Sequence, residues 1–216
     1  MSGRSDNSRE EELKALREMH AARAAAIRRR LREFSQVRTG DYFYELLYCL
    51  LTPQSSAENA ETVVEQLKRA DFENQPIDPE PFLRTKSAYI RFHRTKAKHL
   101  LALKETYPTV LALLGDGQSP LELRERLVKL VPGLGFKEAT HFLRNIGRNG
   151  GLAILDRHII RNLKRYGVIR SFPASLTRRR YLSIERRFIK FSERIGIPID
   201  ELDLLFWSME TGEIRK

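Results

Sequence analysis

The sequence Val131-Pro132-Gly133-Leu134-Gly135-Phe136-Lys137 separates two stretches with helical periodicity. The first stretch ends near Leu130, and the second begins near Glu138 with an apolar face at residues 139, 142, 143 and 146. Two glycines around one aliphatic residue allow a tight turn whose backbone can approach another molecule closely. We expect Leu134 to pack between the helices and the amides of residues 133–135 to point outward at a helix N-terminus. Such amides suit a phosphate oxygen or another anion.

This turn resembles the helix-hairpin-helix element of DNA-binding proteins, spanning here about residues 123–147. Gly133, Leu134 and Gly135 are therefore the expected contacts to the DNA backbone. A plain corner between two helices, with glycine at a helix end, is the alternative.

Helical periodicity also covers most of the remaining chain. Ser55 or Ser56 is suited to cap one helix, and Leu51-Thr52-Pro53-Gln54 ends the helix before it. No convincing period of two occurs, and the short apolar run 152–155 is not expected to form a lone strand. We therefore predict an all-α fold, with helices over residues 9–34, 41–51, 56–70, 80–88, 93–106, 108–114 and 119–130.

The composition favours a polyanionic partner. Among 216 residues, 39 Lys and Arg oppose 28 Asp and Glu, for a net charge of +11. Nucleic acid is the first candidate, an anionic membrane surface is the second, and a basic surface that binds neither remains possible. The single cysteine, Cys49, excludes an intramolecular disulfide and a four-cysteine metal or iron–sulfur site. No run of about 20 apolar residues is present, so we expect no membrane span and a cytoplasmic location, nucleoid-associated in a prokaryote.

Lys137 follows the glycine turn at the start of the second helix. The positive end of the helix dipole and a half-buried cleft both disfavour its ammonium form. A neutral amine could attack a sugar C1′ and form a Schiff base. Taken alone, Lys137 fits a phosphate-binding lysine better than a nucleophile.

Asp156 lies 19 positions downstream, after the paired glycines Gly150-Gly151 and the apolar run 152–155. It stands where an N-cap is expected, before a helix carrying Ile159, Ile160 and Leu163. A carboxylate there could also stabilise positive charge that develops on a sugar as its base leaves. Capping and catalysis are compatible roles.

The glycine hairpin, Lys137, the glycine-rich connection and Asp156 together resemble the helix-hairpin-helix, Gly/Pro-rich, Asp superfamily of DNA glycosylases, over roughly residues 41–165. In that superfamily a lysine at this position marks bifunctional enzymes, which remove a base and also cleave the abasic strand. The segment Leu51–Gln54 is similar to an early superfamily motif, which implies that Gln54 lies near the base pocket or the DNA gap. A solvated turn is the alternative for Gln54.

Absence of a four-cysteine cluster argues against the endonuclease III branch. The chain is similar to the second 8-oxoguanine glycosylase family, of archaea and some bacteria. Three features carry this resemblance: the compact size, the segment Tyr89-Ile90-Arg91-Phe92-His93 before Lys96-Ala97, and a chain that ends in Lys216. The resemblance implies that Trp207 and Lys216 lie near the base pocket. The alternatives are a tryptophan in the core and a chain end without a role. Phe92 is a candidate wedge for the space left by a flipped base, or alternatively a core residue.

The resemblance implies two helical subdomains flanking a DNA-binding cleft. The expected parts are an N-terminal helix (1–40) packed with the C-terminal subdomain, a bundle with the hairpin (41–148), and a C-terminal subdomain carrying the catalytic aspartate (149–216). The expected partner is double-stranded DNA containing oxidised guanine, bound by a monomer without membrane association.

The implied function is an 8-oxoguanine DNA glycosylase with abasic-site lyase activity, acting in base excision repair with Lys137 as nucleophile and Asp156 as its acidic partner. No cofactor or metal is expected, since His93 and His158 belong to no cluster with ligand spacing. A glycosylase for another oxidised base and a non-catalytic DNA-binding module are the alternatives.

Overall fold

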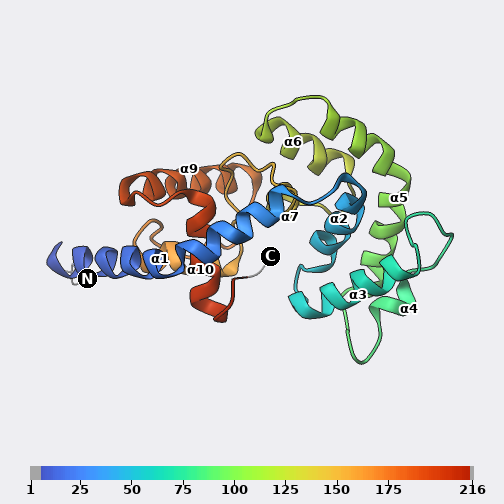
Figure 1. The fold of residues 1–216 in the computed structure, drawn as a ribbon, viewed down its shortest axis with the longest axis horizontal. Coiled ribbons are helices and arrows are strands. Elements are labelled where there is room, and N and C mark those ends of the chain that lie inside the picture. The colour runs from blue at the N-terminus through green and yellow to red at the C-terminus, as the bar shows by residue number, and fades with distance from the viewer. Residues whose placement is uncertain (1–5, 215–216) are drawn as a thin grey trace. The chain divides into compact units, whose positions relative to one another are not determined.

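The computed structural model describes residues 6–214, which form ten α-helices, one short 3-10 helix and no strand. The predicted all-α class is confirmed (Figure 1). The chain divides into two compact units. The central unit is Val37–Gly150, and the terminal unit combines Met1–Gln36 with Gly151–Lys216. Lys216 lies outside the described residues.

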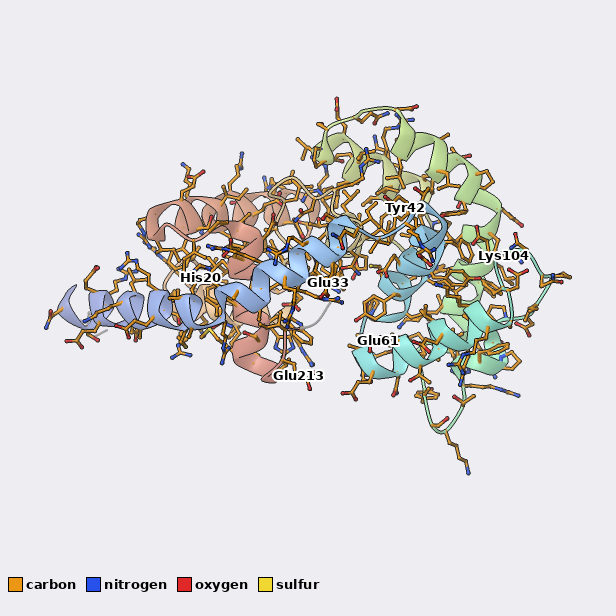
Figure 2. The ribbon with its side chains drawn as sticks, viewed as in Figure 1. His20, Glu33, Tyr42, Glu61, Lys104 and Glu213 are labelled. Atoms are coloured by element: carbon orange, nitrogen blue, oxygen red, sulfur yellow. The ribbon has the colours of Figure 1, made fainter. Side chains whose placement is uncertain are left out.

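The central unit is built around one buried helix. It contains η1 (Thr39–Asp41), α2 (Tyr42–Leu51), α3 (Ala57–Arg69), α4 (Glu80–Leu83), α5 (His93–Gly115), α6 (Pro120–Leu130) and α7 (Phe136–Asn145). Eight of the ten residues of α2 are buried, Cys49 among them, so this helix forms the core of the unit rather than a surface. Helices α3, α5 and α7 pack against it. The ring of Tyr42, labelled in Figure 2, meets Phe142 of α7 edge-on at 6.4 Å between centroids.

Two helices of the central unit begin at caps that the sequence signals. The Ser56 side chain accepts a hydrogen bond from the amide of Asn59 at the start of α3. Ser119 caps α6, and Glu122 reaches back to the Ser119 amide to complete a capping box. These caps satisfy amides that lack partners within the helix.

Three predicted helices differ in the structure. The helix expected over 80–88 ends at Leu83, because the chain folds back and the Leu83 carbonyl accepts the amide of Ile90. The helices expected over 93–106 and 108–114 are one helix, α5, with Pro108 inside it. A proline there costs about 3 kcal/mol. One continuous buried face, including Leu103, Tyr107 and Val110, offsets this cost.

The terminal unit contains α1 (Asp6–Ser35), α8 (Arg157–Arg165), α9 (Arg178–Ile195) and α10 (Ile199–Thr211). Helix α1 packs on α10, and the carboxylate of Glu201 joins the two helices. It contacts Nε2 of His20, labelled in Figure 2, at 2.7 Å and accepts from Nε of Arg28 at 3.0 Å. Part of the arginine-rich face of α1 is therefore used inside the protein. Within residues 6–214, no helix combines the length and apolar character needed to span a bilayer.

Candidate active site and nucleic-acid interface

The predicted hairpin joins α6 to α7 in the central unit. Gly133 has a φ of +82°, in the left-handed region that favours glycine. Leu134 is 4% exposed and fills the space between the helices, as expected. Its amide donates to the carbonyl of Val131 at 3.2 Å, so this amide does not point outward, contrary to our expectation. The reason is that the tight turn uses this amide to close itself.

The two glycines of the hairpin serve different purposes. A side chain at Gly133 would collide with the imidazole of His99, so the glycine is required by internal packing. Gly135 has ordinary extended geometry and is the N-cap of α7. The described chain provides no acceptor for the amides of Gly133 and Gly135, which leaves both available to an anion.

Lys137 is the second residue of α7, and its side chain is 22% exposed. The buried residues Ala139, Phe142 and Leu143 fix the helix against the core. The Lys137 ammonium lies 3.9 Å from Oε1 of Glu138. Sequence reasoning missed Glu138, whose carboxylate lies beside this ammonium group. Its position in the first turn of α7, next to Lys137, was the available signal.

Lys96 is a second lysine near this site, and it is only 6% exposed. Its Nζ donates to the carbonyls of Leu51 and Pro53, at 2.6 and 2.7 Å, and to Oγ of Ser55 at 3.2 Å. Burial, followed by the nearby charge of Lys137, lowers the pKa of Lys96 to about 8. A buried lysine with perturbed protonation is often part of a functional site.

Gln54 and Phe92 occupy exposed turns of the central unit. Both have left-handed backbones, with φ of 57° and 59°. Phe92 precedes α5 and is 54% exposed, so the alternative that it is a core residue is wrong. The packing of α5 begins at Lys96 and Ala97, which leaves the ring of Phe92 outside the core.

Asp156 caps α8 in the terminal unit, as predicted. Its Oδ1 accepts the amides of His158 and Ile159, both at 2.8 Å. Within residues 6–214, its other oxygen has no hydrogen-bond donor. One carboxylate can therefore start the helix and still offer an oxygen to another molecule.

The segment before Asp156 is buried and extended without belonging to a sheet. Helix α9 supplies the hydrogen bonds that this backbone needs. The Tyr181 hydroxyl accepts from the Leu155 amide and donates to the Ala153 carbonyl, and Glu185 accepts from the Ala153 amide. Sequence reasoning missed both residues, although they hold Asp156 in place.

Trp207 lies on α10, in the same unit as Asp156, and is partly exposed. Its ring lies 6.1 Å from that of His158, which is the second residue of α8. Glu210, one turn further along α10, pairs with Arg161 and accepts from Asn162. These contacts hold α10 beside the start of α8.

The terminal unit also has a strongly basic surface. Between Ile160 and Ser192 the only acidic residue is Glu185, and its carboxylate is turned inward to Ala153. A cavity of about 570 Å³ opens here, and five arginines line it: Arg170, Arg179, Arg180, Arg186 and Arg187. Such a surface attracts phosphate groups. Within the described part of the chain, no three His, Cys, Asp or Glu side chains gather in a way that would hold a metal ion.

Comparison with known proteins gives one consistent result. Residues 27–197 match the sequence profile of the 8-oxoguanine DNA glycosylase family. The chain is 40% identical over 193 residues to an 8-oxoguanine DNA glycosylase/AP lyase of Korarchaeum cryptofilum, covering 88% of this chain and 90% of that protein.

Solved structures agree with this match. The 8-oxoguanine DNA glycosylase of Thermotoga maritima superposes with a TM-score of 0.84 at 30% identity, covering 96% of this chain and all of that one. The Methanocaldococcus jannaschii 8-oxoguanine glycosylase/lyase, in complex with a 15mer DNA containing 8-oxoguanine, gives a TM-score of 0.82 at 28% identity, covering 94% and 100%. The resemblance noted in the sequence is confirmed, and the chain belongs to the 8-oxoguanine DNA glycosylase family.

Proposed function

We propose that this protein is a bifunctional DNA glycosylase and abasic-site lyase that excises 8-oxoguanine from duplex DNA. Two residues of suitable chemistry, one in each unit, support the proposal. Lys137 stands in the first turn after the glycine hairpin, and Asp156 caps α8 with one oxygen that accepts no hydrogen bond from residues 6–214. The relatives from Korarchaeum cryptofilum and Methanocaldococcus jannaschii are named for this activity, and the solved structure of the latter shares the fold.

Lys137 is the proposed nucleophile. Its neutral amine attacks C1′ of the damaged nucleotide, the bond between C1′ and the base breaks, and the base leaves with the bonding electrons. Opening of the sugar ring then gives a Schiff base between Nζ and C1′. Loss of a proton from C2′ expels the 3′ phosphate by β-elimination, and water later releases the lysine. Glu138, whose carboxylate lies 3.9 Å from the ammonium, is the proposed acceptor of the proton that Lys137 loses before attack.

Asp156 is the proposed electrostatic partner of this reaction. Positive charge develops on the sugar as the base departs, and a fixed carboxylate stabilises that charge. The hydrogen bonds that the preceding segment makes with Tyr181 and Glu185 hold this carboxylate in place. A rigid charge needs no reorganisation when the reaction occurs.

The DNA backbone is the proposed ligand of the hairpin amides and of the basic surfaces. The amides of Gly133 and Gly135 suit one phosphate, and the arginine-lined cavity of the terminal unit suits others. Trp207 is the proposed base-pocket residue, since its partly exposed ring is held beside α8 by His158. A flipped base would gain stacking against such a ring.

Excision assays on a panel of duplexes test the proposal. The panel has four duplexes, which carry an 8-oxoguanine, an oxidised pyrimidine, an abasic site and no damage, respectively. Base release and strand cleavage are measured separately on each. We expect release of 8-oxoguanine with strand cleavage, and loss of both activities in Lys137→Gln with duplex affinity retained. Lys129→Gln is the matched control, because Lys129 is an exposed lysine of the same hairpin.

The alternatives give different results in the same panel. Preferred release of an oxidised pyrimidine would identify a glycosylase for another lesion. Binding to every duplex without base release or strand cleavage would identify a non-catalytic DNA-binding module. Full activity of Lys137→Gln would remove Lys137 from the reaction.

A further inference from the structure

Two exposed turns of the central unit have strained backbones. Among the described residues, only Gln54, Asp71 and Phe92 have a positive φ without being glycine. Asp71 is readily explained, because aspartate tolerates this conformation and its carboxylate accepts from Asn74 within the turn. Glutamine and phenylalanine lack this compensation, so their turns persist only because the surrounding structure fixes them.

The side chain of Lys96 fixes the turn at Gln54 from both sides. Its ammonium donates to the carbonyl of Pro53, the residue before Gln54, and to the hydroxyl of Ser55, the residue after it. A third hydrogen bond reaches the Leu51 carbonyl at the end of α2. The three donors of the ammonium thus match three acceptors of one corner.

The same network reaches the turn at Phe92. The hydroxyl of Ser55 also accepts the amide of Arg91, the residue before Phe92, at 3.0 Å. The backbone amide of Lys96 donates to the carbonyl of Phe92 at 2.9 Å. Each strained turn is therefore held by Ser55 and Lys96, and the two turns are linked through these residues.

We propose that Lys96 is a positioning residue that, together with Ser55, holds Gln54 and Phe92 as one rigid element. This element enters the duplex when the damaged nucleotide flips out. The inference rests on the proposed function. An aromatic ring offsets stacking lost when a base leaves the helix, and an amide side chain can hydrogen-bond the edge of the base left behind. Both groups must act together, so a link fixed before binding avoids the cost of ordering each one separately.

The protonated form of Lys96 suits this role better than the neutral form. An ammonium has three donors, whereas a neutral amine has two and would leave one acceptor without a partner. Burial lowers the pKa of Lys96, as does the charge of Lys137, but the lowered value of about 8 leaves it mostly protonated at neutral pH. Methionine at this position would keep the volume of the side chain and remove all three donors.

The experiment follows base unstacking directly. Duplexes carry 2-aminopurine beside 8-oxoguanine, and stopped-flow fluorescence measures the unstacking rate on mixing with wild type, Lys96→Met, Ser55→Ala or Lys98→Met. Lys98 is an exposed lysine of the same helix and is the matched control. Duplex affinity and melting temperature are measured for each variant.

We expect Lys96→Met and Ser55→Ala to slow unstacking and 8-oxoguanine excision by about tenfold or more, with affinity for undamaged duplex within about twofold of wild type. Lys98→Met should match wild type. Wild-type unstacking in folded Lys96→Met would overturn the proposal. If Lys96→Met does not fold, the Ser55→Ala variant tests the proposal instead. An unchanged unstacking rate in Ser55→Ala would then overturn the proposal.

Hydrogen exchange separates this inference from the proposed function. Ser55→Ala removes the acceptor of the Arg91 amide, so that amide should exchange faster in the free protein. This result is expected even if wild type releases no 8-oxoguanine, an outcome that would contradict the proposed function instead. Unchanged exchange at Arg91 would contradict the link between the two turns.

Discussion

Replacing Asp156 with asparagine separates the structural role of this residue from its proposed chemical role. In the structure Oδ1 accepts two amides at the start of α8, both at 2.8 Å. Asparagine offers the same oxygen at the same place and is an equally good N-cap. The substitution removes the negative charge and changes little else.

The two roles predict effects of different size. Loss of an N-cap costs about 1 kcal/mol of stability, so Asp156→Ala should lower the melting temperature while Asp156→Asn should not. Loss of a fixed charge that stabilises the transition state costs about 2.7–4 kcal/mol, or roughly 100- to 1,000-fold in rate. Asp156→Ser, a neutral cap, should therefore resemble asparagine in both properties.

Single-turnover excision of 8-oxoguanine with enzyme in excess measures the chemical effect, and thermal unfolding measures the structural one. Thr177→Ala is the control, because Thr177 caps α9 in the same unit. It should lose about 1 kcal/mol of stability and keep the wild-type rate. An Asp156→Asn enzyme within a few-fold of the wild-type rate would refute the reasoning and reduce Asp156 to a helix cap.

Gly135→Ala should weaken binding to damaged and undamaged duplexes alike. The melting temperature should change little, since the new methyl group meets only the flexible carboxylate of Glu138. Unchanged duplex affinity, measured by fluorescence anisotropy, would show that the hairpin is not part of the DNA interface. Trp207→Leu should slow 8-oxoguanine release by about tenfold, because base stacking is worth about 1–3 kcal/mol, but should affect cleavage at a preformed abasic site much less. Equal losses on both substrates would argue against a base-pocket role. The lowered pKa of Lys96 makes the stability of the protein depend on pH. Between about pH 8 and 10.5 the unfolded chain holds the proton of Lys96 more fully than the folded chain does. As the pH rises through this range, the free energy of unfolding of wild type should therefore increase relative to that of Lys96→Met, by up to about 3 kcal/mol. Denaturant titrations at several pH values measure this difference in free energy of unfolding between wild type and Lys96→Met. A difference that stays flat or falls as the pH rises would contradict the burial of this charge.

The features predicted correctly from the sequence are those with local signals. The turn at Gly133 requires a glycine, Ser56 caps the helix that begins at Ala57, and Asp156 caps the helix that directly follows it. In each case the residues that determine the structure are neighbours in the chain. Such patterns can be recognised without knowing the tertiary fold.

The features that were missed depend on contacts between distant parts of the chain. The side chains of Lys96 and Tyr181 bind backbone carbonyls more than twenty residues away, and a carbonyl leaves no trace in the sequence. Helix α5 continues through Pro108 because tertiary burial outweighs a local rule. The residues that shape the site were for this reason harder to predict than those proposed to react in it.

The central claim is that Lys137 forms the covalent intermediate, and borohydride trapping with peptide mapping tests it most directly. Wild-type protein is reduced with borohydride on a duplex containing 8-oxoguanine, digested with trypsin, and analysed by mass spectrometry. A modified Lys137 blocks cleavage after that residue, so the adduct should appear on the peptide of residues 130–144. Lys137→Gln should give no adduct. An adduct on Lys96 or another lysine, or undiminished trapping of Lys137→Gln, would contradict the account.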